Sequence, residues 1–127
     1  MGISSKNFSS KELSCSHCGE NKFDQETLDA LQGLRESIGR PLKLSSAYRC
    51  PVHNSNASST GPDGPHTTGK AIDILCSGKE AWELLSFVMI RSKIWKGIGI
   101  SQKGKHKSRF IHLDTIEADN RPWVWSY

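Results

Sequence analysis

The run Ala71-Ile-Asp-Ile-Leu75 constrains the fold more than any other stretch of the chain, because one carboxylate, Asp73, interrupts an otherwise apolar segment. A short apolar run of this kind is typical of a buried strand. A buried carboxylate is unfavourable unless an opposite charge or a metal ion compensates it. The sequence therefore predicts that a metal ion, Arg49 or a lysine lies against Asp73.

Two helices are expected elsewhere in the chain. Apolar residues recur at helical spacing over residues 25–38, with Asp24 placed as the N-cap and Gly39 placed to end the helix. A second periodic segment predicts a helix over residues 79–91. The apolar residues that define these helices are Leu28, Leu31, Leu34 and Ile38 in the first, and Trp82, Leu85, Val88 and Met89 in the second.

Short apolar or alternating runs predict the strands. Besides 71–75, the expected strands are residues 42–48, a strand marked by Ile98 and Ile100, and residues 110–113. Residues 50–69 are rich in Pro, Gly, Ser, Asn and Thr and predict a long loop, which in a compact domain usually carries function. Residues 1–20 are expected to form an N-terminal arm, and the aromatic tail RPWVWSY is expected to pack on the body. The length of 127 residues predicts one domain, 1–127.

The bulk composition narrows the class of protein. No apolar run approaches the roughly 18 residues that span a bilayer, so no membrane association is expected. We also expect the protein to be a monomer. The N-terminus lacks the apolar stretch of a secretory signal, so we expect synthesis in the cytoplasm and action on the cell wall after release by another route. The formal net charge is +4. Basic residues gather at Lys103, Lys105, Lys107 and Arg109.

This basic segment suits an anionic cell wall, a nucleic acid or a solvated loop. No recognisable nucleic-acid-binding motif accompanies it, so no specific nucleic-acid partner is expected.

Four cysteines are present, and Cys15 and Cys18 form one C-x-x-C pair. Such a pair is half of a structural zinc site, which usually has four ligands. The residues available to complete it are Cys50, Cys76, His17 and His53. The alternative is that the cysteines are free thiols, since disulfides are disfavoured in a reducing cytoplasm.

Two histidines are placed to reach Asp73. His66 ends the long loop, Gly69 lets the backbone turn before the strand of Asp73, and His112 lies on its own expected strand. Two nitrogens and one oxygen leave a fourth tetrahedral position open, which is the arrangement of a catalytic zinc ion. The plainer alternatives are that His66 is an ordinary loop histidine and that His112 is a hydrogen-bonded strand histidine.

Three ordered motifs cover these residues. They are S-x-Y-R-x-x-x-x-N from Ser46 to Asn54, H-x-x-G-x-A-x-D from His66 to Asp73, and F-I-H-L-D from Phe110 to Asp114. In order and spacing they resemble the M15 metallopeptidases, which include D-alanyl-D-alanine carboxypeptidases and phage peptidoglycan endopeptidases and share a fold with the hedgehog signalling domain. The resemblance runs from about Phe8 to the C-terminus.

The resemblance implies that His66, Asp73 and His112 bind a catalytic Zn²⁺ ion. It also implies that Arg49 binds a carbonyl or carboxylate oxygen of the substrate and stabilises the oxyanion. This role suits the guanidinium, which is planar, always charged and able to donate two hydrogen bonds at once. Ser46 and Tyr48, from the same motif as Arg49, are expected to bind substrate.

Two positions depart from the family pattern. Gly64 replaces a serine that members often carry two residues before the first zinc histidine, so substrate contacts are expected to differ. Arg109 replaces the acidic general base that several members carry three residues before the last zinc histidine, and arginine accepts no proton at neutral pH. Asp114 is the expected base, because strand alternation puts it on the same face as His112. The alternative is that Asp114 orients a metal ligand; the reserve bases are Asp63, His106 and Glu117.

Together these patterns predict an α+β domain with a small antiparallel sheet, helices packed on one side and a zinc cleft on the exposed face. The expected activity is zinc-dependent hydrolysis of peptide bonds in peptidoglycan stem peptides or crosslinks. The enzyme would be an endopeptidase or a D,D-carboxypeptidase, acting as a phage endolysin or in wall remodelling. Two alternatives stay open: a non-catalytic zinc-containing binding domain of the hedgehog type, and a nucleic-acid-binding module that uses residues 103–109.

Overall fold

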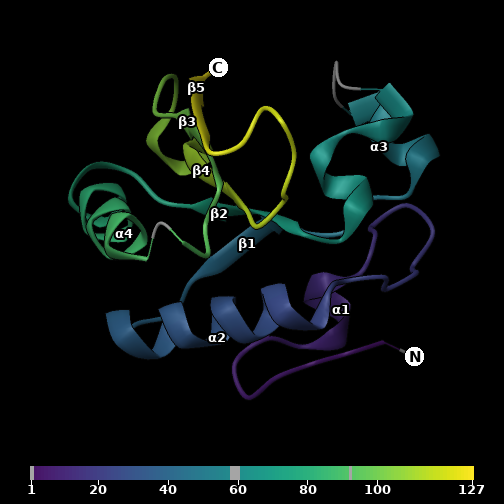
Figure 1. Cartoon of the computed structure of the whole chain (residues 1–127), viewed down its shortest axis with the longest axis horizontal. Coiled ribbons are helices and arrows are strands. Elements are labelled where there is room, and N and C mark those ends of the chain that lie inside the picture. Colours follow the sequence, from purple (N-terminus) through teal and green to yellow (C-terminus); the bar gives the residue numbers. More distant parts are fainter. Residues whose placement is uncertain (1, 58–60, 92) are drawn as a thin grey trace.

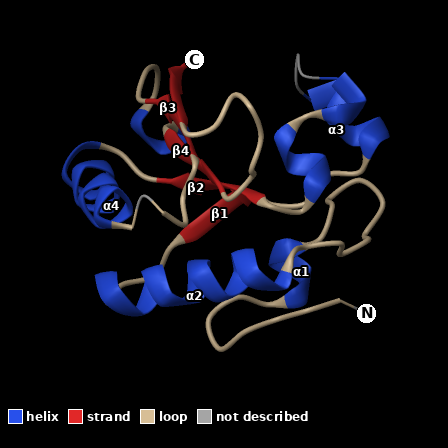
Figure 2. Ribbon diagram, in the orientation of Figure 1, coloured by secondary structure: helices blue, strands red, loops and turns tan. Residues whose placement is uncertain are grey.

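The structure of the chain is a computed structural model that describes residues 2–57, 61–91 and 93–127. Helices surround a central sheet (Figure 2). In chain order the elements are α1 (Ser10–Leu13), α2 (Gln25–Ile38), β1 (Lys43–Ser46), α3 (Pro51–Ala57), β2 (Ala71–Leu75), α4 (Gly78–Ile90), β3 (Gly97–Ser101), β4 (Phe110–Asp114) and β5 (Trp123–Ser126). Three short 3₁₀ segments are η1 (Gly61–Asp63), η2 (Pro65–Thr68) and η3 (His106–Ser108).

The strands form one sheet in the order β1-β2-β4-β3-β5. The pairs β1–β2, β2–β4 and β4–β3 are antiparallel, whereas β5 lies parallel to β3. The expected α+β class is therefore confirmed, and the sheet is mixed rather than purely antiparallel. The added parallel strand comes from the aromatic tail, which packs on the body as expected.

One face of the sheet carries the core. Ile72 and Ile74 of β2, with Ile111 and Leu113 of β4, are buried in one apolar cluster. Apolar residues of α2 and α4 complete this cluster, and Figure 1 shows these two helices along the sheet, with α3 well separated from both. The helical contributors that are fully buried are Leu28, Leu31, Leu34, Leu84 and Val88. The opposite face of the sheet is left for polar residues.

Helix α2 has the predicted bounds, Gln25–Ile38. The side chain of Asp24 accepts a hydrogen bond from the Thr27 N–H at 3.0 Å, which caps the start of the helix. Gly39 ends it in the left-handed conformation at φ 76°, donating its N–H to the carbonyl of Arg35. The end signals read from the sequence are therefore confirmed.

Helix α4 covers Gly78–Ile90, close to the expected 79–91, and the predicted apolar face is right at Leu85 and Val88 but wrong at Trp82 and Met89. Trp82 and Met89 are 77% and 61% exposed. The helix carries apolar residues nearly all round, so periodicity alone does not single out the buried side. The residues it buries are Ala81, Leu84 and Val88.

The segment expected as a long loop, residues 50–69, is partly helical. It contains α3, η1 and η2, while residues 58–60 lie outside the described part of the chain. Pro51 is the first residue of α3, a position where proline starts a helix without losing a hydrogen bond. The polar composition concealed this helix.

The N-terminal arm, residues 1–20, is packed rather than free over its described part. Phe8 and Leu13 are almost fully buried in the main core. Ser9 and Glu12 form a reciprocal capping box at the start of α1. In the described ranges, no helix is both long and apolar enough to span a membrane.

Gly99→Ala is expected to lower the free energy of unfolding by about 1–3 kcal/mol through overpacking. A Cβ at Gly99 would lie 2.7 Å from indole atoms of Trp125. Gly33→Ala is the matched control at an exposed position of α2, where an added Cβ meets nothing within 4 Å. The control is expected to raise the free energy of unfolding by about 0.5–1 kcal/mol. Urea unfolding measures both, and a Gly99→Ala protein as stable as the parent would contradict the close approach.

Candidate metal centre

The polar face of the sheet carries a row of aligned residues from all five strands. Strand pairing aligns, in order across the sheet, Ser46, Asp73, His112, Gly99 and Trp125. Because side chains alternate along each strand, this row lies opposite the apolar face that packs on α2 and α4. Asp73 thus keeps its carboxylate out of the hydrocarbon core, although the side chain is buried.

His66 joins this row from η2, just before β2. Gly69 ends η2 with φ 74°, and a β-carbon there would collide with the carbonyl oxygen of Lys22. The turn brings His66 Nε2 to 3.2 Å from Asp73 Oδ1, and His112 Nδ1 lies 3.1 Å from the same oxygen. One ligand atom from each of these three residues lies within 4.8 Å of the others. The fold therefore brings the three expected metal ligands together.

The imidazole rings of His66 and His112 each make a second hydrogen bond on the side away from Asp73. These bonds determine which nitrogen of each neutral ring carries the proton. His66 Nδ1 lies 2.8 Å from the carbonyl oxygen of Ala47, which only accepts, so Nδ1 carries the proton. His112 Nε2 lies 2.8 Å from Asp114 Oδ2, so Nε2 carries the proton of that ring. The neutral rings therefore turn bare nitrogens toward the Asp73 carboxylate. Three acceptors in this arrangement need a cation among them, so the donor set fits a metal ion.

The pKa values of the buried groups follow the same arrangement. Burial raises the pKa of Asp73, but hydrogen bonds and charge from His112 and His66 outweigh burial and hold it well below its ordinary range. Burial lowers the pKa of His112, whereas hydrogen bonds with Asp114 and Asp73 raise it, with a net increase. The site thus favours an ionised Asp73 beside a positive charge, which either a proton on histidine or a metal ion supplies.

Asp114 is fully buried behind His112. Arg121 binds it with two hydrogen bonds, Nε to Oδ1 at 3.0 Å and Nη2 to Oδ2 at 2.9 Å. Burial raises the pKa of Asp114, but hydrogen bonds from His112 and Arg121 outweigh burial and lower it. The ionised carboxylate therefore touches the nitrogen of His112 that faces away from Asp73. This geometry favours the interpretation in which Asp114 orients a ligand over the one in which it is the general base.

The alternating glycines of β3 make room for these groups. A β-carbon at Gly97 would collide with the Asp114 carboxylate, and one at Gly99 would collide with Trp125. Sequence reasoning missed the contributions of Arg121 and Trp125. The available signal was the G-I-G-I pattern, since glycines on one face of a strand often mark a close approach by another group.

Arg49 lies at the edge of the same site. Its Nη2 is 3.7 Å from Asp73 Oδ2, and its Nη1 donates to Asn54 Oδ1 at 3.3 Å. Its backbone N–H donates to the carbonyl of His66 at 3.1 Å. Asn54 is fully buried and its amide also donates to the carbonyl of Gly61. The asparagine of the first motif therefore holds the guanidinium from behind, which leaves Arg49 beside the metal ligands.

An open cleft of about 960 Å³ lies over the three ligands, and Arg49 also lines it. Aromatic side chains of Trp123, Trp125 and Tyr127 form one wall. The rings of His112 and Trp125 are 4.9 Å apart between centroids, so the tail contacts one of the candidate metal ligands. Among the described residues that line this cleft, Asp73 is the sole carboxylate.

The two expected substrate contacts beside Arg49 separate in the structure. Ser46 lines the cleft, with its Oγ 3.3 Å from His66 Nδ1. Tyr48 is buried against Cys15 and Cys50 and does not line the cleft. The expected contact between Tyr48 and substrate is therefore not supported.

The reserve bases also lie away from the cleft. Asp63, His106 and Glu117 are exposed, and none of them lines it. Arg109, which occupies the position of the family's acid, donates to the carbonyl of Gly104 at 3.0 Å. None of these four residues therefore lies where it could accept a proton from a water molecule in the cleft.

The sheet, the two histidines and the aspartate define an α+β domain with a candidate metal site. The sequence model of the family Peptidase M15 matches residues 6–114, most of the chain. The chain therefore belongs to the Peptidase M15 family, whose members are metallopeptidases, and its expected class as a peptidase acting on peptides is confirmed. A search of curated proteins finds no match.

Asp114→Asn is expected to weaken zinc binding about 10–100-fold, because a neutral amide holds the Nε2 proton of His112 more weakly than a carboxylate does. Equilibrium dialysis with zinc measures the loss, and Glu117→Gln, at an exposed acid outside the cleft, is the matched control. Thermal unfolding accompanies the assay because the change leaves Arg121 without its buried partner. Unchanged zinc affinity together with a lost acidic limb of the pH–rate profile would instead identify Asp114 as the base.

Proposed function

We propose that the chain is a zinc-dependent peptidase that cleaves peptide bonds in peptidoglycan stem peptides or their crosslinks. The observation that carries the proposal is the convergence of His66 Nε2, Asp73 Oδ1 and His112 Nδ1 on the floor of an open cleft. Membership of a metallopeptidase family supports the same conclusion. The enzyme would act as an endopeptidase or as a D,D-carboxypeptidase, and its context would be phage lysis or remodelling of the cell wall.

The ligand set favours zinc over other ions. Two imidazole nitrogens and one carboxylate oxygen match catalytic zinc sites, which keep a further position open. Calcium and magnesium prefer six or more oxygen ligands, and this site offers a single carboxylate. A zinc ion bound here would supply Lewis-acid activation of a water molecule and of the scissile carbonyl.

Arg49 has the position to bind the substrate beside that centre. Its contact with Asp73 is long, at 3.7 Å, and its side chain is 17% exposed, so the guanidinium retains donors for a ligand in the cleft. A planar fork of donors suits the carbonyl or terminal carboxylate of a peptide. We propose that Arg49 orients this group and stabilises the negative charge that develops on it.

The wall of the cleft supports a peptide substrate. Trp123 is 60% exposed and Tyr127 is 49% exposed, so aromatic faces are available beside the ligands. Aromatic side chains bind the apolar surface of small side chains such as those of alanine and present few competing charges. The net charge of +4 supports association with an anionic wall polymer.

Asp114 and Arg121 act, in this proposal, through His112. The bidentate ion pair fixes Asp114, and Asp114 fixes the tautomer and orientation of the ring. Asp114 is therefore a positioning residue that does not line the cleft, whereas Arg121 both holds Asp114 and lines the cleft.

A second candidate function follows from the carboxylates of the cleft. Asp73 is the sole carboxylate among the described residues that line it, and Asp73 is needed as a ligand. A metallopeptidase usually has a separate group to accept the proton of water. This observation favours, as the alternative, a non-catalytic zinc-containing domain that binds wall peptides in the same cleft.

Arg49→Lys is expected to lower kcat about 10²–10³-fold while zinc binding is retained. Lysine keeps the positive charge but presents a point charge in place of two fixed donors. Steady-state cleavage of a synthetic stem peptide measures the effect, with Arg109→Lys as the control outside the cleft. Activity near that of the parent would show that Arg49 is only a structural partner of Asp73 and Asn54.

Purified peptidoglycan incubated with the protein is expected to release peptide fragments whose masses identify the bond cleaved. A chelator should abolish release and added zinc should restore it, because the metal is bound reversibly. His66→Ala should be inactive, whereas His106→Ala, at an exposed histidine, should match the parent. A folded, zinc-loaded protein that binds wall fragments without cleaving them would favour the binding-domain alternative.

A further inference from the structure

Three of the four cysteines converge at a second place in the fold. One sulfur each from Cys15, Cys18 and Cys50 lies within 4.8 Å of the others, and none of the cysteines forms a disulfide. Cys15 and Cys18 belong to the turn after α1, whereas Cys50 directly precedes α3. None of the three lines the cleft over His66, Asp73 and His112. The cluster is therefore separate from the candidate catalytic site.

The backbone directs hydrogen-bond donors at these sulfurs. The N–H of Cys50 donates to Cys15 Sγ at 3.3 Å, and the N–H of His53 donates to Cys50 Sγ at 3.4 Å. Donors of this kind stabilise thiolates, and thiolates are the form of cysteine that binds metal. The two donors act on the sulfurs of Cys15 and Cys50, so the surroundings of this pair favour a negative charge.

The turn between Cys15 and Cys18 is shaped so that both sulfurs can reach one ion. Gly19 adopts φ 77°, and its N–H donates to the carbonyl of Cys15 at 2.8 Å. The N–H of Cys15 donates to the carbonyl of Glu20 at 2.7 Å, which closes the turn from the other side. A left-handed residue is needed directly after Cys18, and glycine adopts this conformation at little cost.

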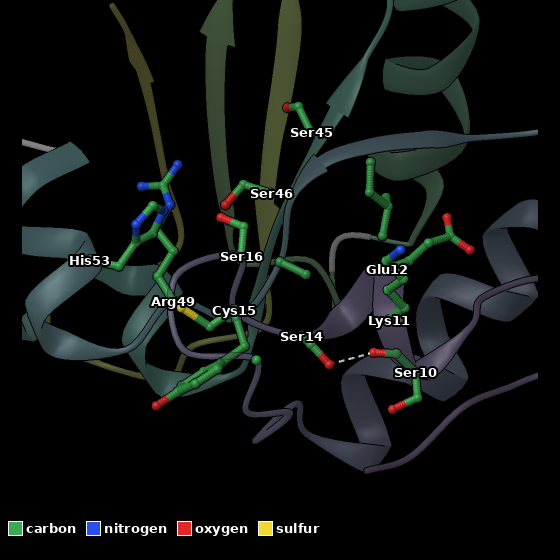
Figure 3. A pocket seen from close by; sticks show the side chains of 14 residues that line it. Ser10, Lys11, Glu12, Ser14, Cys15, Ser16, Ser45, Ser46, Arg49 and His53 are labelled. Carbon is green, nitrogen blue, oxygen red and sulfur yellow. Dashed lines mark hydrogen bonds between the residues drawn. The ribbon is translucent and has the colours of Figure 1, made fainter. Parts of the chain in front are cut away.

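His53 is the candidate for the fourth ligand, and its ring lies outside the 4.8 Å group of the three sulfurs, so it would have to turn toward them when metal binds. It follows Cys50 by three residues, so C-x-x-H mirrors the C-x-x-C of Cys15 and Cys18. Its ring stacks on that of His17, with centroids 5.8 Å apart and planes at 19°, beside the cysteine turn. His53 is half-buried whereas His17 is exposed. The close-up of the adjoining pocket shows Cys15, Arg49 and His53 as lining residues of one hollow (Figure 3).

We propose that Cys15, Cys18, Cys50 and His53 bind a second, structural zinc ion. Three thiolates and one imidazole form a closed four-ligand set, which is typical of structural rather than catalytic zinc. Soft sulfur ligands favour zinc over magnesium or calcium. The remaining cysteine, Cys76, lies elsewhere: it is buried in the main core, with its sulfur 3.5 Å from the carbonyl of Ile74.

The site would join the N-terminal segment to the residues that hold Arg49. The N–H of Tyr48 donates to the carbonyl of Leu13 at 3.3 Å, so the two segments already touch. Arg49 directly precedes Cys50, and a metal on Cys50 fixes the backbone on one side of Arg49. The second ion would therefore support the cleft from behind without contacting substrate.

The experiment uses the full chain purified under reducing conditions and loaded with Co²⁺ in place of Zn²⁺. The parent is expected to bind two ions and to show the thiolate-to-cobalt charge-transfer band in the near ultraviolet, which needs cysteine ligands. Cys18→Ser, at an exposed position, should lose that band and one ion. The matched control Cys76→Ser should keep both, and His112→Ala should lose one ion yet keep the band.

Elemental analysis of the zinc-loaded proteins gives the same count without relying on spectra. His53→Ala should weaken binding at the cysteine site, whereas His17→Ala should not. A parent protein that binds one ion and leaves all four thiols reactive would overturn the proposal, as would a disulfide among Cys15, Cys18 and Cys50 under reducing conditions. Loss of the site in His17→Ala but not in His53→Ala would overturn the assignment of His53. The charge-transfer band is independent of peptide hydrolysis, so this result stands apart from that of the proposed function.

Discussion

The carboxylate of Asp73 is the constraint on which the site and the sheet around it depend. Its oxygen faces two histidine nitrogens that carry no proton in the neutral rings, at 3.2 and 3.1 Å. Such a set of acceptors is stable only with a positive charge among them. Because β2, β4 and the turn after His66 all meet at this point, a cation bound here would stabilise the folding of this face.

Around Asp73, each ligand is oriented by a group that lies further from the cleft. The carbonyl of Ala47 holds His66, while Asp114 holds His112 and is itself held by Arg121. Arg49 is held in turn by Asn54. The outer groups fix ring tautomers and guanidinium direction before a substrate arrives, which lowers the ordering cost of binding. Orientation of His112 also gives a role to the buried ion pair of Arg121 and Asp114, since a buried ion pair by itself adds little to stability.

Local patterns in the sequence predicted α2, α4 and the central strands, whereas α3 and several contacts of the site depend on the folded chain. The ends of α2 follow from Asp24 and Gly39, because capping acts within a few residues. The pairing of Arg121 with Asp114 depends on the path of the chain between β4 and β5, which no periodicity encodes. The approach of Cys50 to Cys15 joins residues 35 positions apart and likewise needs the folded chain. The buried face of α4 was predicted only in part, because that helix is apolar on nearly every side.

The candidate metal ligands of the cleft and its aromatic wall come from different parts of the chain, because the wall is supplied by the tail strand β5. The family match ends at residue 114, so β5 lies beyond the segment that carries the candidate metal ligands. Yet Trp123 and Trp125 of β5 form the aromatic wall next to them. Side-chain changes on this one strand would therefore alter the wall of the cleft without replacing His66, Asp73 or His112.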